Sequence, residues 1–134
     1  MVQTQAIKRY RQNLVAERNA TLLYERLAEA ESNVDLATVY RKLADTERGH
    51  VRFWEDKLRD AGAEVPAFRP TWRTRILGAL ATRFGTGFVL PTIAGIEQQA
   101  GAEYDGQPEA EAAGLPRHER SHARIFGQLA KSSQ

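Results

Sequence analysis

Two short motifs in this sequence place a carboxylate and an imidazole three residues apart. They are Glu47 with His50, and Glu119 with His122. Residues three apart on an α-helix lie on the same face, so each pair would present an oxygen donor and a nitrogen donor in the same direction. One Glu-x-x-His motif is common by chance. Two copies of the motif, each in a segment with helical periodicity, indicate a metal site.

Two further glutamates, Glu17 and Glu97, lie on apolar helical faces elsewhere in the chain. Each is followed seven residues later by a tyrosine, Tyr24 or Tyr104, which is two turns along the same face. The order Glu-x6-Tyr and then Glu-x-x-His therefore occurs twice, in residues 1–62 and 86–131. This degenerate internal repeat predicts two halves related by an approximate two-fold axis, which suits a symmetric site for two metal ions.

Charge balance makes these glutamates informative. An isolated buried carboxylate costs on the order of several kcal/mol, so a sequence that buries several must compensate their charge. Two divalent cations would offset the four carboxylates, and carboxylate oxygens can bridge two metals while imidazole nitrogens complete the coordination. This donor set favours iron or manganese over calcium. The predicted ligands, which would also form the catalytic centre, are Glu17, Glu47, His50, Glu97, Glu119 and His122.

Hydrophobic periodicity predicts the helices that would position these ligands. Apolar residues and candidate ligands recur at steps of three and four in residues 4–30, 35–61, 88–105 and 109–131. A shorter helix is expected at 72–84, between the second and third long helices. No segment alternates with period two, so no strand is expected. The prediction is an all-α four-helix bundle with an extra short crossover helix.

Capping and breaking residues set the expected helix ends. Ser32, Asn33 and Asp35 offer N-caps for the second helix, and Gly62 occupies the position of a left-handed C-terminal cap. Pro116 cannot lie in the middle of an unbroken helix. The last segment is therefore expected to break near Gly114 and to resume at Pro116.

Composition excludes several other classes of protein. The 134 residues fit one domain, 1–134, and contain no cysteine, which excludes disulfides, thiolate zinc sites and iron–sulfur clusters. The net charge is only +2 and basic residues are interleaved with acidic ones, so no nucleic-acid surface is expected. No secretory signal is visible, and the longest nearly apolar stretch, 88–96, is far shorter than the ~20 residues of a spanning helix. We expect a soluble, cytoplasmic chain.

With these motifs, the chain resembles the ferritin-like superfamily and, within it, the rubrerythrin branch, from Ile7 to Leu129. The stretches that carry the resemblance most closely are ERNATLLYERLAEAE, YRKLADTERGHVRFWEDKL and ERSHARIFGQL. They are most similar to the rubrerythrin-like domains that precede a vacuolar-iron-transporter-type membrane domain in bacterial membrane-bound ferritins. The resemblance implies a ferritin-like bundle that holds two iron ions, with Glu47 and Glu119 as bridging ligands.

The same resemblance implies a function and partners. It implies ferroxidase chemistry in iron homeostasis, with Fe(II) oxidised by oxygen or peroxide, and a C-terminal membrane iron-transporter domain in a longer protein at the cytoplasmic face of the membrane. A homodimer is expected separately, because symmetric bundles commonly form dimers. The sequence departs from rubrerythrins in two ways. It has no cysteine for a rubredoxin domain, and Ala100 stands where rubrerythrins place a second glutamate of the third helix. The first departure weighs against a rubrerythrin-type peroxidase cycle.

Several alternatives remain open from sequence. The chain could be a non-catalytic iron- or manganese-sensing or metal-delivery module, a metal-free structural bundle, a di-iron oxygenase with an organic substrate, or a manganese catalase. The four glutamates could instead occupy solvated helix faces.

For several single residues and for one helix, the sequence allows two interpretations. Tyr24 and Tyr104 are either core residues or second-shell groups that hydrogen-bond a ligand carboxylate. Trp54 either packs in the core or forms a wall of the metal site, and His118 is expected at the surface rather than in a metal pair with His122. The basic helix at 72–84 is expected to cover the bundle or pair with a second subunit, and a membrane-surface role is the alternative.

Overall fold

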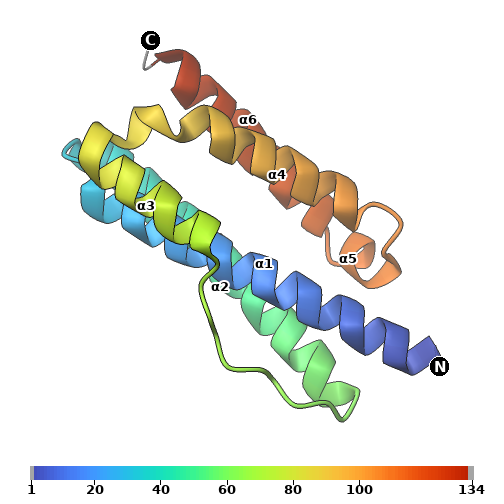
Figure 1. Cartoon of the computed structure of the whole chain (residues 1–134). Helices are drawn as coiled ribbons and strands as arrows, with labels where there is room; N and C mark the ends of the chain where they lie inside the picture. Colours follow the sequence, from blue (N-terminus) through green and yellow to red (C-terminus); the bar gives the residue numbers. More distant parts are fainter. Residues whose placement is uncertain (1, 133–134) are drawn as a thin grey trace. The chain divides into compact units, whose positions relative to one another are not determined.

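Every regular element in residues 2–132, the part of the chain that the computed structural model describes, is helical. Contacts divide the chain into two units, Met1–Ala79 and Leu80–Gln134, and each is described separately below. Within residues 2–132 the elements are α1 (Val2–Ala30), α2 (Val34–Asp60), α3 (Trp72–Phe84), the 3-10 helix η1 (Thr86–Phe88), α4 (Leu90–Tyr104), α5 (Pro108–Ala112) and α6 (Leu115–Ser132) (Figure 1).

The first unit is built on a hairpin of α1 and α2, which run side by side in opposite directions (Figure 1). A connection of three residues, 31–33, turns the chain, and the Asn33 side chain accepts a hydrogen bond of 3.0 Å from the Leu36 amide to cap α2. Leu14 and Leu27 of α1 and Leu58 of α2 are completely buried. Burial of this apolar stripe, rather than helix propensity alone, is what stabilises the pair.

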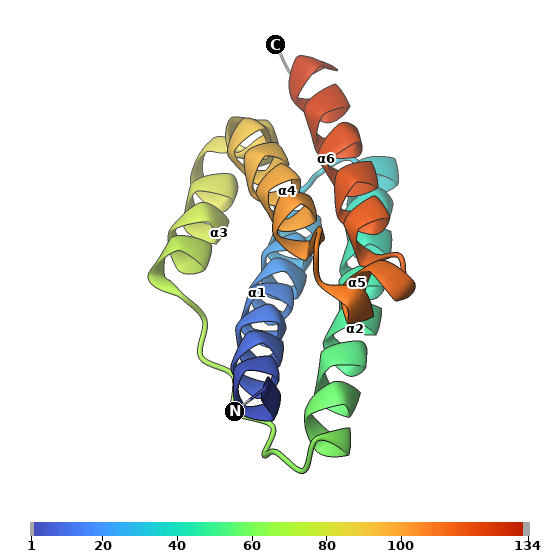
Figure 2. The same ribbon diagram turned by 90° about the vertical axis from the view of Figure 1, so that its right-hand side faces the viewer.

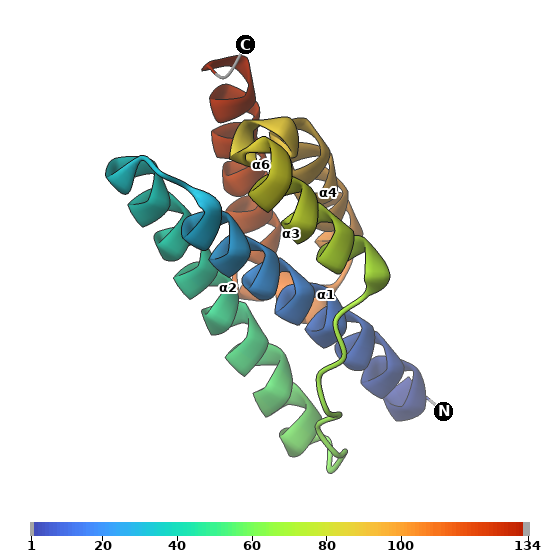
Figure 3. The ribbon, with the colours of Figure 1, turned by 60° about the vertical axis from the view of Figure 1, so that its left-hand side comes forward.

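The segment after α2 returns along α1 (Figure 3). Gly62, with φ of 73°, ends α2 in a Schellman-type turn in which the Ala63 amide donates to the Leu58 carbonyl at 2.9 Å. Arg18 of α1 donates to the Pro66 carbonyl at 2.6 Å. Asn19 accepts a 2.9 Å bond from the Thr71 amide, directly before α3 begins. Side chains of α1 therefore fix where α3 starts.

The second unit is built on α4 and α6, which lie side by side (Figure 2). Their close approach occurs at Gly101, where a Cβ atom would come within 3.0 Å of the Arg120 side chain and 3.4 Å of the Pro116 carbonyl. The short helix α5 precedes α6, and Gly114, with φ of 77°, separates the two. Pro116 is then the second residue of α6, where its missing N–H breaks no helical hydrogen bond.

The predicted fold class, all-α with a short helix between the second and third long helices, is confirmed. The predicted break at Gly114 is also confirmed, although α6 begins one residue earlier than expected. Two details of the prediction are wrong. The third long helix begins at Leu90, after η1, rather than at residue 88. Steps of three and four back from Glu119 through Leu115 also predict Ala112 on the apolar face, but it is exposed, because α5 ends there and Ala110 is buried instead.

Two surface observations bear on the expected environment of the chain. Among residues 2–132, no helix is long and apolar enough to cross a membrane. The helix α3 and η1 nevertheless expose several large apolar side chains, namely Trp72, Ile76, Phe84 and Phe88. Both interpretations of this segment, as a cover or subunit contact and as a membrane-surface helix, stay predictions.

Replacing the glycine that ends α2 should destabilise the fold. A Gly62→Ala variant must place a Cβ-bearing residue at φ of 73°, which costs about 1 kcal/mol even though no neighbouring atom lies within 4 Å. The matched control is Gly95→Ala, in the exposed interior of α4 with an ordinary φ and open space around it, which should stabilise by up to about 1 kcal/mol. Urea unfolding of both variants tests this, and equal effects would contradict the assigned cap.

Candidate metal centre

A seven-residue spacing on α1 and α2 places aromatic side chains on both sides of the candidate ligands. On α1, Glu17 lies between Tyr10 and Tyr24, and on α2, Glu47 lies between Tyr40 and Trp54. All of these aromatic side chains are at most 9% exposed. Because the two helices are antiparallel, Tyr24 and Tyr40 lie toward one end of the pair, and Tyr10 and Trp54 toward the other. The carboxylates between them are therefore shielded from solvent at both ends.

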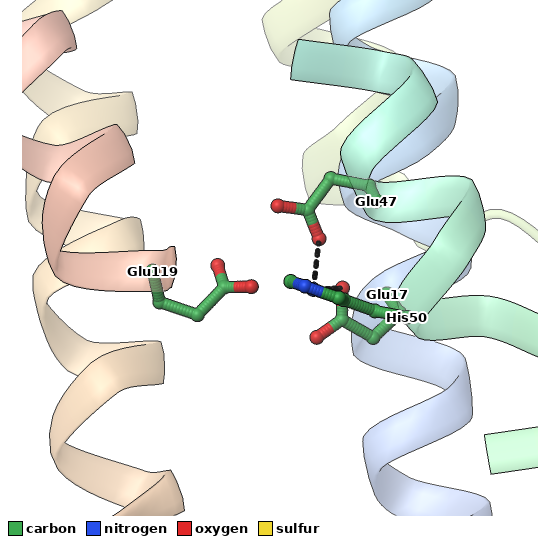
Figure 4. Close-up of side chains that lie close together, drawn as sticks. All are labelled: Glu17, Glu47, His50 and Glu119. Carbon is green, nitrogen blue, oxygen red and sulfur yellow. Dashed lines mark hydrogen bonds and ion pairs between the residues drawn. The ribbon is translucent and has the colours of Figure 1, made fainter. Parts of the chain in front are cut away.

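The first unit gathers three predicted ligands into one cluster (Figure 4). The His50 ring nitrogen Nδ1 lies 3.3 Å from Glu17 Oε2 and 3.4 Å from Glu47 Oε2. One ligand atom from each of these residues lies within 4.8 Å of the others, a spacing at which a metal ion can contact all three. Their exposed fractions are 3% for Glu17, 0% for Glu47 and 4% for His50.

The second unit gathers the other three predicted ligands in the same way. His122 Nδ1 lies 3.9 Å from Glu97 Oε2, and ligand atoms of Glu97, Glu119 and His122 lie within 4.8 Å of one another. Their exposed fractions are 1%, 2% and 5%. Each unit thus joins a lone glutamate of its first long helix to the Glu-x-x-His motif of its second. This is the grouping that the internal repeat predicts.

Burial of two carboxylates in one cluster has an electrostatic cost. Desolvation, followed by the charge of Glu47, raises the pKa of Glu17 from 4.5 to about 8, and the imidazole of His50 opposes this only in part. In the metal-free protein, a proton therefore offsets some of the negative charge. A divalent cation would do the same while using both carboxylates and the imidazole as ligands, so the donors present fit iron or manganese.

The burial values decide between some of the sequence interpretations. The four glutamates do not lie on solvated helix faces, and His118 is exposed and belongs to neither cluster. Tyr24 and Tyr104 are buried, which suits both a core role and a hydrogen bond to a ligand carboxylate, so the hydrogen bond stays a prediction. The ligand role of the six clustered residues likewise stays a prediction.

Sequence reasoning overlooked part of the environment of the first cluster. Only the tyrosines that follow the lone glutamates stood out, whereas Tyr10 and Tyr40 lie seven residues before Glu17 and Glu47. Reading the seven-residue spacing in both directions would have found them. The packing of Tyr10 against Trp54 across the two helices could not be found in this way, since it depends on how the helices are rotated toward each other.

Helical pairs that each bury two glutamates and a histidine define the class of ferritin-like di-iron carboxylate proteins. The chain belongs to the COQ7 family, since the family model described as ubiquinone biosynthesis protein COQ7 matches residues 5–113. This family consists of di-iron hydroxylases of ubiquinone biosynthesis, and the expectation of iron as the cofactor is thereby confirmed. No curated protein and no solved structure matches the chain.

The family match does not cover all six of the predicted ligands. It includes Glu17, Glu47, His50 and Glu97 but ends before Glu119 and His122. These last two are identified by the repeat and by their cluster with Glu97. The comparisons support the broad ferritin-like di-iron superfamily. They give no support to the narrower resemblance to rubrerythrin-like domains of membrane-bound ferritins.

Lowering the pH should stabilise the metal-free protein through Glu17. Its carboxyl binds a proton below about pH 8 in the folded chain but only below about 4.5 when unfolded. The folded state therefore binds more protons between these values, and the contribution to the free energy of unfolding falls as the pH rises through this window. Glu17→Gln removes that dependence.

The measurement is urea unfolding in the presence of a chelator at several pH values. The stability of Glu17→Gln relative to wild type should increase from about pH 4.5 to about pH 8 and then level off. Glu29→Gln, which changes an exposed glutamate of the same helix, is the control and should show no such trend. A constant difference between Glu17→Gln and wild type would contradict the raised pKa.

Proposed function

We propose that the chain is a di-iron carboxylate protein of ferroxidase type, in which the six clustered residues bind two iron ions and Fe(II) is oxidised by oxygen or peroxide. The observation that carries the proposal is the pair of buried clusters, each with two carboxylates and one imidazole whose ligand atoms lie within 4.8 Å. Each unit carries half of the donors. The proposed functional unit is therefore the whole of residues 1–134 as one domain.

The charge of the clusters supports oxidation of iron as the reaction. Two buried carboxylates per cluster attract Fe(III) more strongly than Fe(II), because the Coulomb energy grows with the charge of the ion and is large where water is excluded. Binding therefore favours loss of an electron from the metal. The balanced reaction with peroxide is 2 Fe(II) + H2O2 + 2 H+ → 2 Fe(III) + 2 H2O.

The protein's own residues have distinct parts in this proposal. The glutamates and histidines bind Fe(II) and stabilise the higher charge of the product. The aromatic side chains next to the first cluster, Tyr10, Tyr24, Tyr40 and Trp54, keep bulk water away and hold the helices in register. Iron, when bound, supplies the electrons that reduce oxygen or peroxide.

Family membership favours a second candidate function, hydroxylation of a ubiquinone precursor, since COQ7 proteins are hydroxylases of ubiquinone biosynthesis. Such a reaction takes one oxygen atom into the product and reduces the other to water, so it needs two electrons and two protons from an external reductant. The same donor set could serve both reactions. Both reactions consume an oxidant, and they differ in what is oxidised. The first oxidises Fe(II), whereas the second oxidises an organic substrate and also needs a reductant.

Fe(II) oxidation should depend on His122 and not on its neighbour His118. The two histidines are one turn apart on α6, but His122 is clustered with Glu97 and Glu119 while His118 is exposed. His122→Ala should lower iron affinity by at least about tenfold, the effect seen even for residues that only orient ligands, and the rate should approach that of buffer. His118→Ala is the matched control and should behave as wild type.

The assay measures Fe(III) formation after apo-protein and Fe(II) are mixed in air, together with metal content per chain. Glu47→Ala, which removes a fully buried carboxylate of the other cluster, should also lose the excess rate. Equal behaviour of the two histidine variants would overturn the assignment of the site. Binding of iron that raises the melting temperature, but with no oxidation beyond buffer, would favour the alternative of a metal-sensing or delivery module.

A second assay separates the two oxygen-dependent proposals. Oxygen consumption is measured with Fe(II) alone, and then with a ubiquinone precursor and a reductant. Under the ferroxidase proposal, oxygen uptake follows the Fe(II) added and is unchanged by the quinone. Oxygen uptake that follows the quinone, with a hydroxylated product, would replace the ferroxidase proposal by the hydroxylase.

A further inference from the structure

A pair of stacked aromatic side chains connects the first cluster with the edge of its helix pair. Trp54 lies on α2, one turn after His50 and two turns after Glu47, and is completely buried. Residues four apart on a helix are neighbours, with Cβ atoms about 6 Å apart. The indole is therefore a neighbour of His50, one of the predicted metal ligands.

The indole of Trp54 stacks on Tyr10 of α1. The ring centroids are 5.5 Å apart and the planes are inclined by 30°. Tyr10 is 9% exposed and is the outer member of the pair, and the guanidinium of Arg9 lies 5.5 Å from the centroid of its ring. The order from the cluster outward is thus His50, Trp54, Tyr10 and then a charged residue at the edge of the unit.

Packing alone does not require these residue types. A stacked pair of large aromatics could be formed by phenylalanine at either position, with similar burial of apolar area. Indole and phenol are, however, the aromatic side chains that most readily lose an electron. Their rings are in contact, so an electron can pass from one to the other over a short distance.

We propose that Tyr10 and Trp54 form an electron relay to the first cluster, so that Tyr10 supplies a second electron when only one Fe(II) is available there. This inference rests on the proposed function. Reduction of peroxide to water takes two electrons, whereas one Fe(II) supplies one. Without a second donor, the other product would be a hydroxyl radical.

The proposed step balances in atoms and electrons as Fe(II) + H2O2 + Tyr–OH + H+ → Fe(III) + Tyr–O• + 2 H2O. One electron comes from Fe(II) and one from the Tyr10 phenol, by way of the Trp54 indole. The phenol O–H bond breaks, and its proton is released. The peroxide O–O bond breaks, and both oxygen atoms leave as water.

Freeze-quench EPR of the full chain, loaded with one equivalent of Fe(II) and mixed with hydrogen peroxide, tests the relay. The expected result is a tyrosyl radical signal that narrows when the protein carries ring-deuterated tyrosine. Tyr10→Phe should abolish the signal. Trp54→Phe, which keeps an aromatic ring in the core, should lose it as well, while Fe(II) is still oxidised in both variants.

Tyr40→Phe is the matched control. Tyr40 is a completely buried tyrosine of the same unit, seven residues from Glu47 on the opposite side from Trp54, and its replacement should leave the signal unchanged. A radical that persists in Tyr10→Phe, or that is unaffected in Trp54→Phe, overturns the relay, as does iron oxidation by the wild type with no tyrosyl radical. Fe(II) oxidation no faster than in buffer overturns the proposed function and the relay together.

Discussion

The placement of negative charge away from water is the constraint on which the rest of this structure depends. Glu17 and Glu47 share one buried cluster, and the pKa of Glu17 rises to about 8 because burial desolvates its carboxylate and the charge of Glu47 adds to the cost of ionising it. A fold that maintains such a cluster gives up stability for function. A bound cation would offset the charge of the buried carboxylates, so the metal-bound form is expected to be the stable and functional one.

The helices meet this constraint through simple geometry. A spacing of three residues turns a carboxylate and an imidazole of one helix toward the same point, and a spacing of seven places large side chains two turns away on the same face. The first unit uses aromatic rings on both sides of both carboxylates, whereas the second has Leu90 before Glu97, Tyr104 after it and Phe126 after Glu119. The two clusters therefore contain the same types of donor but are surrounded by different side chains.

The donor set defines a class of chemistry more closely than it defines a substrate. Two carboxylates and an imidazole per cluster suit iron that reacts with oxygen or peroxide, and the COQ7 family uses such iron for hydroxylation. Whether Fe(II) itself or an organic ring is oxidised depends on what can reach the iron and on which reductant is at hand. Side chains around the ligands decide both.

The sequence by itself determined the all-α class, most helix ends to within two residues and the identity of the clustered residues, because periodicity, caps and glycine or proline breaks act within a few residues. The helix Trp72–Phe84 and the Gly62 cap, for example, lie where the sequence predicts them. Both predictions rest on local signals. Only the tertiary structure decided that His50 lies within 3.4 Å of both Glu17 and Glu47, and that Trp54 stacks on Tyr10. These contacts join residues of different helices, and they depend on how α1 and α2 are rotated and shifted against each other, which no local pattern specifies.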